Sequence, residues 1–238
     1  MAELKSRKRQ QLWRRFNRWL QSKLPERADP IRYNRLVRET YDGPAGWFTL
    51  ITGYLTGHEP LARRLIRPQA FGIRGCKRIL DAGTGNGRYL RILAQRADPE
   101  AVVVGCDLSL GMLKRAGKRL KGHRPFLVQA DVTRLPFPDD YFDAIIFGWV
   151  LEHLPDPLAG LRELARVLRP GGKMLLMTTE DNTLGAICSR VYRCRATSRA
   201  QLKRWCSQAN LLWYREWWWS RFHQALRLGG IVVELRRR

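Results

Sequence analysis

Three glycines and two acids form the most informative spacing in this sequence of 238 residues. Gly83, Gly85 and Gly87 follow an apolar run that ends near Asp81, within the stretch KRILDAGTGNGRYL. Glycine lets a backbone approach a ligand closely, so a glycine-rich turn after a strand is typical of a nucleotide-binding loop. Asp107 ends the next apolar run, twenty residues after Gly87, where a carboxylate can accept both hydroxyls of a ribose. The pattern predicts a ligand that carries a ribose.

The spacing of the glycines separates this loop from two other nucleotide loops. The dinucleotide fingerprint GxGxxG would need a glycine where the sequence has Arg88, and the phosphate loop ending in GK[ST] is absent. A dehydrogenase is therefore disfavoured. Two later positions extend the pattern. Asp131 follows the third apolar run, in QADVTRLPF, where an adenine edge would lie, and Gly148 ends the fourth run, in FDAIIFGWVLEHL.

The elements that position these residues alternate from Cys76 onward. Continuous Val, Ile and Leu runs flanked by amphipathic helices predict a parallel sheet that is covered on both faces, which is a doubly wound α/β fold. The expected strands are residues 78–82, 102–107, 125–131, 142–148 and 173–179, and the expected helices are 88–96, 110–121 and 158–168. RPGG, at 169–172, is expected to form a turn. A helix at 198–210 with Ser198 as its cap and two strands at 211–219 and 229–237 complete the chain.

The stretch from about 76 to 180 resembles a class I S-adenosylmethionine-dependent methyltransferase. The subgroup it is most similar to includes the C-methyltransferases of ubiquinone and menaquinone synthesis and many small-molecule methyltransferases. The resemblance covers nearly half of the chain. It implies a mostly parallel seven-stranded, Rossmann-like sheet whose last strand runs antiparallel, with the strands at 211–235 as the closing hairpin. It also implies S-adenosylmethionine as the cofactor.

The resemblance assigns a role to each residue that matches the family's motifs. Asp81, Gly83 and Gly85 match the motif that holds the methionine end of the cofactor, and Gly87 lets the following helix approach. Asp107 matches the acid that binds the ribose hydroxyls, and Leu108 the residue beside the adenine. Asp131 and Val132 match the pair that binds the adenine edge, and Gly148 the carbonyl that faces the methionine ammonium. The alternatives are strand-end roles for Asp81 and Asp107 and a turn cap for Asp131.

Candidate catalytic groups lie just past the fourth strand and in the N-terminal part of the chain. His153, in VLEHLPDP, has the residue type of a general base, because its unperturbed pKa lies near neutrality. The alternative is that the Glu152–His153 pair holds the loop or the cofactor. Tyr41 and Asp42, in ETYDGPAGWF, resemble the tyrosine-bearing lid that precedes the core in this subgroup, and core packing is the alternative for Tyr41. His58 and His223 are weaker candidates.

The chain divides into three expected parts. Residues 1–27 carry Trp, Phe and Leu at helical spacing with arginines off that stripe, which predicts a basic amphipathic helix. This helix fits a membrane interface, packing on its own domain, or a mitochondrial presequence. Residues 28–75 are expected to form a helical lid, and 76–238 the cofactor-binding core, with an insert at about 180–198 that shapes the acceptor pocket. In LLWYREWWWSRF, alternation places Trp217 and Trp219 on one face and Trp218 on the other.

Composition bounds the partners. The net charge of +23 predicts an anionic partner, unless it reflects a compositional bias toward arginine. The five cysteines show no paired spacing, so we expect reduced thiols and no metal. No apolar run is long enough to span a membrane and no signal peptide is evident, which predicts a cytoplasmic protein with an optional peripheral position at the inner membrane face.

The leading hypothesis is a methyltransferase for a small or lipid-like acceptor. Its more specific version places the enzyme at a membrane surface. An RNA methyltransferase is the first alternative because of the charge. Nucleic acid is the less favoured partner, because two versions of this activity lack their motifs after the fourth strand: the [DNS]PP[YF] run of exocyclic-amine methylation and the attacking cysteine of base C5 methylation. The alternative that stays open is an RNA methyltransferase for a ribose or another target that is not an exocyclic amine. A noncatalytic cofactor-binding protein is the second alternative.

Overall fold

The structure of the chain is a computed structural model that describes residues 30–42, 58–123, 125–182, 185–186, 189, 194–218 and 230–238. Its centre is a seven-stranded sheet with the strand order β3-β2-β1-β4-β5-β7-β6. The strands are β1 (Arg78–Ala82), β2 (Val102–Asp107), β3 (Phe126–Gln129), β4 (Phe142–Gly148), β5 (Leu168–Thr178), β6 (Leu211–Trp217) and β7 (Ile231–Arg237). All pairs are parallel except β5 with β7 and β7 with β6, as expected for the closing hairpin.

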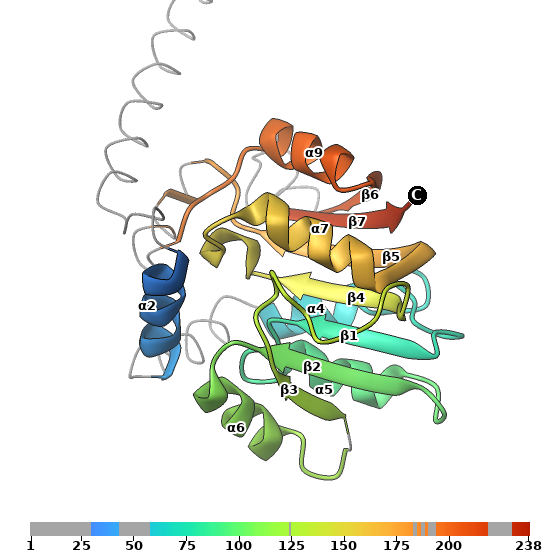
Figure 1. Cartoon of the computed structure of the whole chain (residues 1–238). Coiled ribbons are helices and arrows are strands. Elements are labelled where there is room, and N and C mark those ends of the chain that lie inside the picture. Colours follow the sequence, from blue (N-terminus) through green and yellow to red (C-terminus); the bar gives the residue numbers. More distant parts are fainter. Residues whose placement is uncertain are drawn as a thin grey trace, which may run out of the picture.

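Helices cover both faces of this sheet (Figure 1). They are α2 (Pro30–Asp42), α4 (His58–Leu65), α5 (Arg88–Arg96), α6 (Leu110–Arg119), the 3₁₀ turn η1 (Leu151–His153), α7 (Pro157–Val167) and α9 (Arg199–Gln208). Apolar residues of α4, α5 and α6 are buried in one cluster against the sheet, and those of α7 and α9 are buried in a second cluster. The prediction of a doubly wound α/β fold is therefore confirmed.

The strand order reverses beside β1, and this reversal positions the candidate site. The chain runs outward from β1 to β2 and β3, then returns to place β4 on the other side of β1. Connections that leave β1 and β4 in opposite directions open a crevice at the carboxyl ends of the two strands, which is where open α/β sheets bind ligands. In Figure 1, α2 stands beside these carboxyl ends.

Two segments differ from their predicted form. The RPGG segment is not a separate turn but a bulge inside β5, because Leu168 pairs with Phe142 and the ladder resumes with Lys173 opposite Ala144. A bulge between Trp213 and Arg215 shifts the pairing of β6 in the same way. As a result the side chains before and after the second bulge do not follow one alternation.

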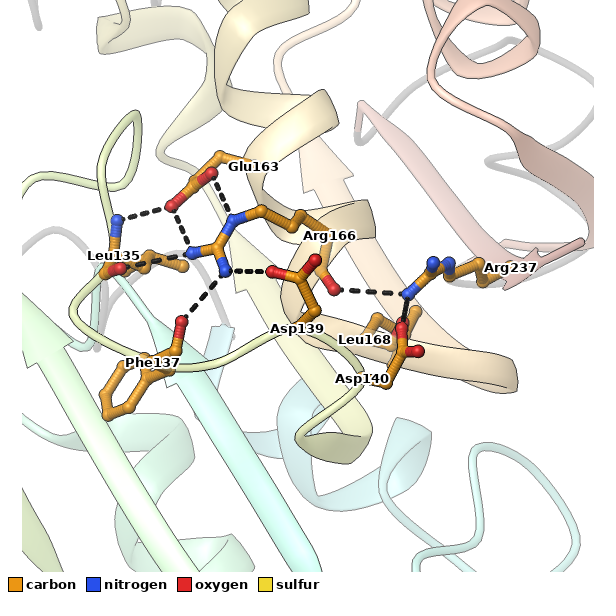
Figure 2. A network of polar contacts seen from close by, with 8 residues as sticks. All are labelled: Leu135, Phe137, Asp139, Asp140, Glu163, Arg166, Leu168 and Arg237. Atoms are coloured by element: carbon orange, nitrogen blue, oxygen red, sulfur yellow. Dashed lines mark hydrogen bonds and ion pairs between the residues drawn. The ribbon is translucent and has the colours of Figure 1, made fainter.

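At the amino ends of the strands, opposite the candidate site, Arg166 of α7 ties the loop before β4 to the helix (Figure 2). Its guanidinium donates to both carboxylate oxygens of Glu163, to Asp139, and to the carbonyl oxygens of Phe137 and Leu135, over distances of 2.6 to 3.2 Å. Glu163 also accepts the Leu135 N–H at 2.7 Å. The hydrogen bonds from Arg166 hold the pKa of Glu163 below its usual range. Arg166 thus ties the loop before β4 to α7, and Arg237 of β7 also donates to Asp140 of this loop.

Replacing Arg166 by methionine is expected to lower the free energy of unfolding by about 2–3 kcal/mol, because Glu163 then keeps only the Leu135 N–H and two carbonyls lose the donor that Arg166 supplies. Arg169→Met is the matched control. The Arg169 side chain is 51% exposed where it pairs with Asp143, and such pairs contribute about 1 kcal/mol or less. Urea unfolding of both variants measures the difference. Equal losses would show that Arg166 is an ordinary surface arginine.

Candidate active site

The loop after β1 is shaped by its glycines. Gly83 has a φ of 70°, and a Cβ there would lie 2.2 Å from Cγ2 of Val150, so no other residue fits. Gly85 has a φ of 54° and nothing lies within 4 Å of the position of its missing Cβ. Gly87 precedes α5 as its N-cap. The loop is therefore packed on one side at Gly83 and open on the other at Gly85, where a ligand can approach the backbone.

Asp81 is buried beneath this loop, with 1% of its surface exposed. One carboxylate oxygen, Oδ2, accepts a hydrogen bond from Thr84 Oγ1 at 2.6 Å. Burial raises the pKa of Asp81 to about 7, and the nearby Asp107 adds to the effect. A carboxyl group that titrates near neutrality inside a ligand loop is typical of a functional site.

Asp107 joins the end of β2 to the glycine loop. Its two carboxylate oxygens accept the Gly85 N–H at 2.8 Å and the Ser109 N–H at 2.9 Å. Burial raises the pKa of Asp107, although both backbone hydrogen bonds oppose this effect. Each oxygen keeps a second lone pair, which is what a ribose diol requires. Leu108, next to it, is half-buried, and its carbonyl accepts Gln129 Nε2 at 3.1 Å.

Asp131 lies two residues past the end of β3 and has two sets of partners. Its Oδ1 accepts the backbone N–H and the hydroxyl of Thr133, both at 2.8 Å, which is the turn-cap arrangement considered from the sequence. Its Oδ2 accepts Asn34 Nδ2 of α2 at 2.8 Å. The Val132 side chain is 5% exposed and packs in the core, so contact with a ligand there is left to the backbone.

The last turn of α2 is docked on the start of α6. Asp42 Oδ1 accepts the hydroxyl of Ser109 and the Gly111 N–H, the latter at 3.0 Å. Arg115 donates to the carbonyl oxygens of Tyr41 and Asp42, at 2.8 and 3.1 Å. These contacts hold α2 beside the carboxyl ends of the strands. Nothing in the spacing of the sequence indicated the roles of Asn34 and Arg115.

The docking of α2 brings together the two predicted catalytic candidates. Tyr41 Oη lies 2.9 Å from His153 Nε2, within hydrogen-bond distance, although 112 positions separate the residues. The rings meet edge to face, with centroids 5.3 Å apart and an interplanar angle of 88°. A histidine whose ring is oriented by a tyrosine hydroxyl has the geometry of a positioned general base.

Glu152 holds the turn that carries His153. The residue is 3% exposed, and its carboxylate accepts the hydroxyls of Thr178 and Thr179, both at 2.8 Å. Burial raises the pKa of Glu152. These bonds tie η1 to the end of β5, so Glu152 holds the turn in which His153 lies.

Gly148, at the end of β4, allows close packing behind the site. A Cβ at this position would lie 2.9 Å from Met177 Cε and 3.0 Å from Tyr89 Cε2. The next residue, Trp149, has a φ of 62°, which is unusual for a bulky side chain. Its backbone N–H donates to the Met177 carbonyl at 2.8 Å, and its indole N–H donates to Tyr89 Oη at 3.2 Å. The turn from β4 into η1 is therefore fixed from both sides.

Several predicted residues lie outside the described part of the chain. They are residues 1–27, residues 28–29 and 43–57 of the expected lid, the His58 side chain, residues 183–184, 187–188 and 190–193 of the expected insert at 180–198 (Cys188 among them), Trp219 and His223. Cys76, Cys106 and Cys206 are buried with free thiols, and Cys194 is buried as well. Within the described ranges, no group of three His, Cys, Asp or Glu side chains could hold a metal ion, and no helix is long and apolar enough to cross a membrane.

Comparison with known proteins agrees with this geometry. Residues 80–176 match the family model described as a methyltransferase domain. The chain is 35% identical over 144 residues to a ubiquinone/menaquinone biosynthesis C-methyltransferase of Desulfotalea psychrophila, over 60% of this chain and 58% of the relative. It is 35% identical over 176 residues to the demethylmenaquinone methyltransferase of Mycolicibacterium paratuberculosis, over 73% of each chain. The aligned part thus ranges from just over half to about three quarters of these two relatives.

The fold is shared with solved structures. The magnesium protoporphyrin IX methyltransferase of Synechocystis PCC 6803, solved with S-adenosylhomocysteine bound, superimposes with a TM-score of 0.68 at 18% identity, over 86% of this chain and 99% of that one. The sheet and the carboxyl-edge site define a Rossmann-like class I methyltransferase. This chain belongs to the S-adenosylmethionine-dependent methyltransferase family.

The site residues fit the family's cofactor. The open space at Gly85 admits a ligand to the backbone, Asp107 keeps acceptor capacity for two hydroxyls, and the buried Asp81 supplies negative charge near a cationic ligand. S-adenosylmethionine carries an ammonium and a sulfonium, so it favours the ionised form of Asp81. The affinity is therefore expected to be constant above pH 7 and to fall by up to about tenfold per pH unit below it.

Asp81→Asn is the control for this pH dependence. The variant is expected to bind more weakly and to lose the pH dependence between 6 and 8, as measured by titration calorimetry at each pH. Because the folded-state pKa is raised, the folded protein binds the extra proton and wild-type stability falls as the pH rises from about 4 to 7. Ligand-free Asp81→Asn should thus be more stable than wild type at pH 8, by up to about 4 kcal/mol, but not at pH 4. A pH-independent wild-type affinity would contradict the assignment.

Proposed function

We propose that the chain transfers a methyl group from S-adenosylmethionine to a small, lipid-like acceptor of the hydroquinone type. The observation that carries the proposal is the contact between Tyr41 and His153 at the edge that also holds Asp81, the glycine loop and Asp107. The names of the two relatives, which refer to ubiquinone and menaquinone methylation, support the choice of acceptor. An acceptor of this kind carries an acidic ring hydroxyl, which a general base can deprotonate.

Each part of the cofactor is assigned to different residues of the chain. Asp107 would hold the ribose hydroxyls, Leu108 would lie beside the adenine, and the backbone around Asp131 and Val132 would meet the adenine edge. Asp81, Gly83 and Gly85 would hold the methionine end, with the Gly148 carbonyl toward the ammonium, and Gly87 lets α5 follow the loop closely. When bound, the cofactor supplies an activated methyl group, so the protein has to align and deprotonate the acceptor.

His153 is proposed to take the proton from the acceptor hydroxyl as the acceptor atom bonds to the methyl group. If that atom is a ring carbon, it then loses its own hydrogen as a proton, and the hydroxyl oxygen regains one. Loss of that proton raises the electron density of the ring and makes its nucleophilic atom more reactive. Tyr41 holds the imidazole through the 2.9 Å contact with Nε2, so it acts as a positioning residue. Because Asp42, Arg115 and Asn34 tether α2, the orientation of Tyr41 depends on α2 remaining docked.

A lipid-like acceptor also places the protein at a membrane surface. The net charge of +23 favours an anionic surface, and the basic segment 1–27 is the part for which a membrane contact was predicted, although it lies outside the described residues. The same charge is what favours the RNA alternative. The two classes of acceptor differ in solubility, which separates them in one assay.

The test is methyl transfer from radiolabelled S-adenosylmethionine to an apolar cell extract and, in parallel, to total RNA. Label in the organic phase that depends on His153 supports the proposal. Label that stays with RNA and is removed by ribonuclease would overturn it in favour of the RNA alternative. Binding of the cofactor without label in either fraction would favour a noncatalytic cofactor-binding protein.

A further inference from the structure

An unusual surface lies on β6, at the edge of the sheet farthest from β3. On the face of β6 that α9 covers, Trp213 contacts Lys203, and Glu216 pairs with Arg199. The other face presents Leu212, Tyr214 and Arg215 of β6 beside Arg236 of β7, a set called here the β6 stripe. Leu212 and Tyr214 are 42% and 56% exposed, Arg215 is exposed, and the Arg236 side chain is 43% exposed.

The bulge in β6 brings these residues onto one face. Leu212 pairs with Arg236 and Arg215 pairs with Glu234, so the one extra residue between Trp213 and Arg215 is Tyr214. Strict alternation would turn Tyr214 and Arg215 to opposite faces. Instead the Arg236 guanidinium lies 3.5 Å from the centre of the Tyr214 ring, and the Arg215 guanidinium lies 3.9 Å from that of Trp217. Two stacked cation–aromatic pairs therefore stand side by side on the sheet edge.

We propose that the β6 stripe is a docking surface for an anionic lipid membrane. Exposed leucine and tyrosine beside arginine is the combination that enters the interface of a bilayer, with the apolar groups at the acyl boundary and the guanidinium groups at the phosphates. Nucleic acid fits this surface less well. Single strands bind through aromatic faces on which bases stack, and here a guanidinium covers one face of Tyr214 and of Trp217. Leu212 adds apolar area that a phosphate backbone does not use.

The direction of the strand connects the stripe to the candidate active site. Because β6 is antiparallel to β7 and β7 is antiparallel to β5, β6 runs in the direction of β5. Trp217, which ends β6, therefore lies at the carboxyl edge, where Tyr41 and His153 meet. A membrane bound along the stripe would therefore adjoin the edge of the sheet that holds the candidate active site. In this respect the inference rests on the proposed function and names the surface that it needs.

The test is binding of the full chain to vesicles, without cofactor or acceptor, so its failure would leave the methyl-transfer proposal untouched. Sedimentation with phosphatidylcholine–phosphatidylglycerol vesicles is compared with pure phosphatidylcholine vesicles. Arg215→Gln is expected to weaken binding to the anionic vesicles about fivefold, the effect of one basic residue near the surface. The double variant Leu212→Ser, Tyr214→Ser should weaken it by about tenfold, because both apolar groups are removed. Thermal unfolding confirms that each variant is folded.

Lys121→Gln is the matched control, because Lys121 is exposed and follows α6 at the other end of the sheet. It removes the same charge and should leave vesicle binding within twofold of wild type. Equal weakening of vesicle binding by Lys121→Gln and Arg215→Gln would show that binding depends on net charge alone, and this would overturn the proposal. Vesicle binding at the wild-type level by folded stripe variants would also overturn it. The same holds if the stripe variants lose affinity for an RNA oligonucleotide but keep their affinity for the vesicles.

Discussion

Replacing Asp107 by asparagine is expected to weaken S-adenosylmethionine binding by about a hundredfold. The ionised carboxylate is the shared acceptor for the Gly85 and Ser109 N–H groups, and it is the group assigned to the ribose hydroxyls. Hydrogen bonds to a charged group contribute about 1.5–3 kcal/mol each. Asparagine removes the charge from both bonds to the ribose and turns one acceptor oxygen into an NH2 donor, which corresponds to about this factor. Equilibrium dialysis with S-adenosylhomocysteine, which has the same ribose, measures the effect.

Asp98→Asn is the matched control for this substitution. The Asp98 carboxylate also accepts a backbone N–H, that of Gly75, but it lies after α5, at the amino end of β2. Its replacement should leave ligand affinity unchanged within about twofold. Because burial raises the pKa of Asp107, the Asp107→Asn protein should remain folded at pH 7. A folded Asp107→Asn protein with wild-type affinity would contradict the assigned role.

Replacing His153 by alanine is expected to lower kcat by about 10² to 10⁴, the usual contribution of a general base. Binding of S-adenosylmethionine should change little, since Asp81, Asp107 and the glycine loop are intact. His123→Ala, in the loop after α6, is the control and should leave kcat unchanged. Single-turnover methyl transfer to the apolar acceptor measures the chemical step. An unchanged kcat in folded His153→Ala would assign His153 to structure alone.

Tyr41→Phe separates positioning from packing. The phenylalanine keeps the edge-to-face ring contact but removes the hydroxyl that lies 2.9 Å from His153 Nε2. We expect a loss of about tenfold in kcat with a shifted pH profile, because the base loses a hydrogen-bond partner. A role in packing alone would leave kcat and the pH profile of Tyr41→Phe unchanged.

The sequence predicted those parts of the molecule that depend on neighbours in the chain. Asp81, the three glycines and Asp107 lie at strand ends that their own apolar runs define, and parallel strands bring their carboxyl ends to one edge. The hydrogen bond between Asn34 and Asp131 could not be predicted, because it depends on how α2 docks across 97 positions of sequence. Tyr41 and His153 were predicted as two separate candidates, and their contact was not predicted.

Bulges account for the other differences. RPGG contains the residues of a tight turn, and its local propensity gives no indication that Leu168 pairs with Phe142 before it. The one extra residue in β6 likewise changes which side chains share a face, and this decides whether Arg236 can stack on Tyr214. Register is set by pairing between strands, so the β6 stripe was not visible in the alternation of the sequence.

Calorimetric titration of the full chain with S-adenosylmethionine and with NAD tests the central claim most directly. The claim is that the glycine loop and Asp107 form a site for the methyl donor of this family, and not for a dinucleotide. The predicted result is a single site of micromolar affinity for S-adenosylmethionine, with no heat from NAD beyond dilution. Binding of NAD, or no binding of either ligand by folded protein, would contradict the account.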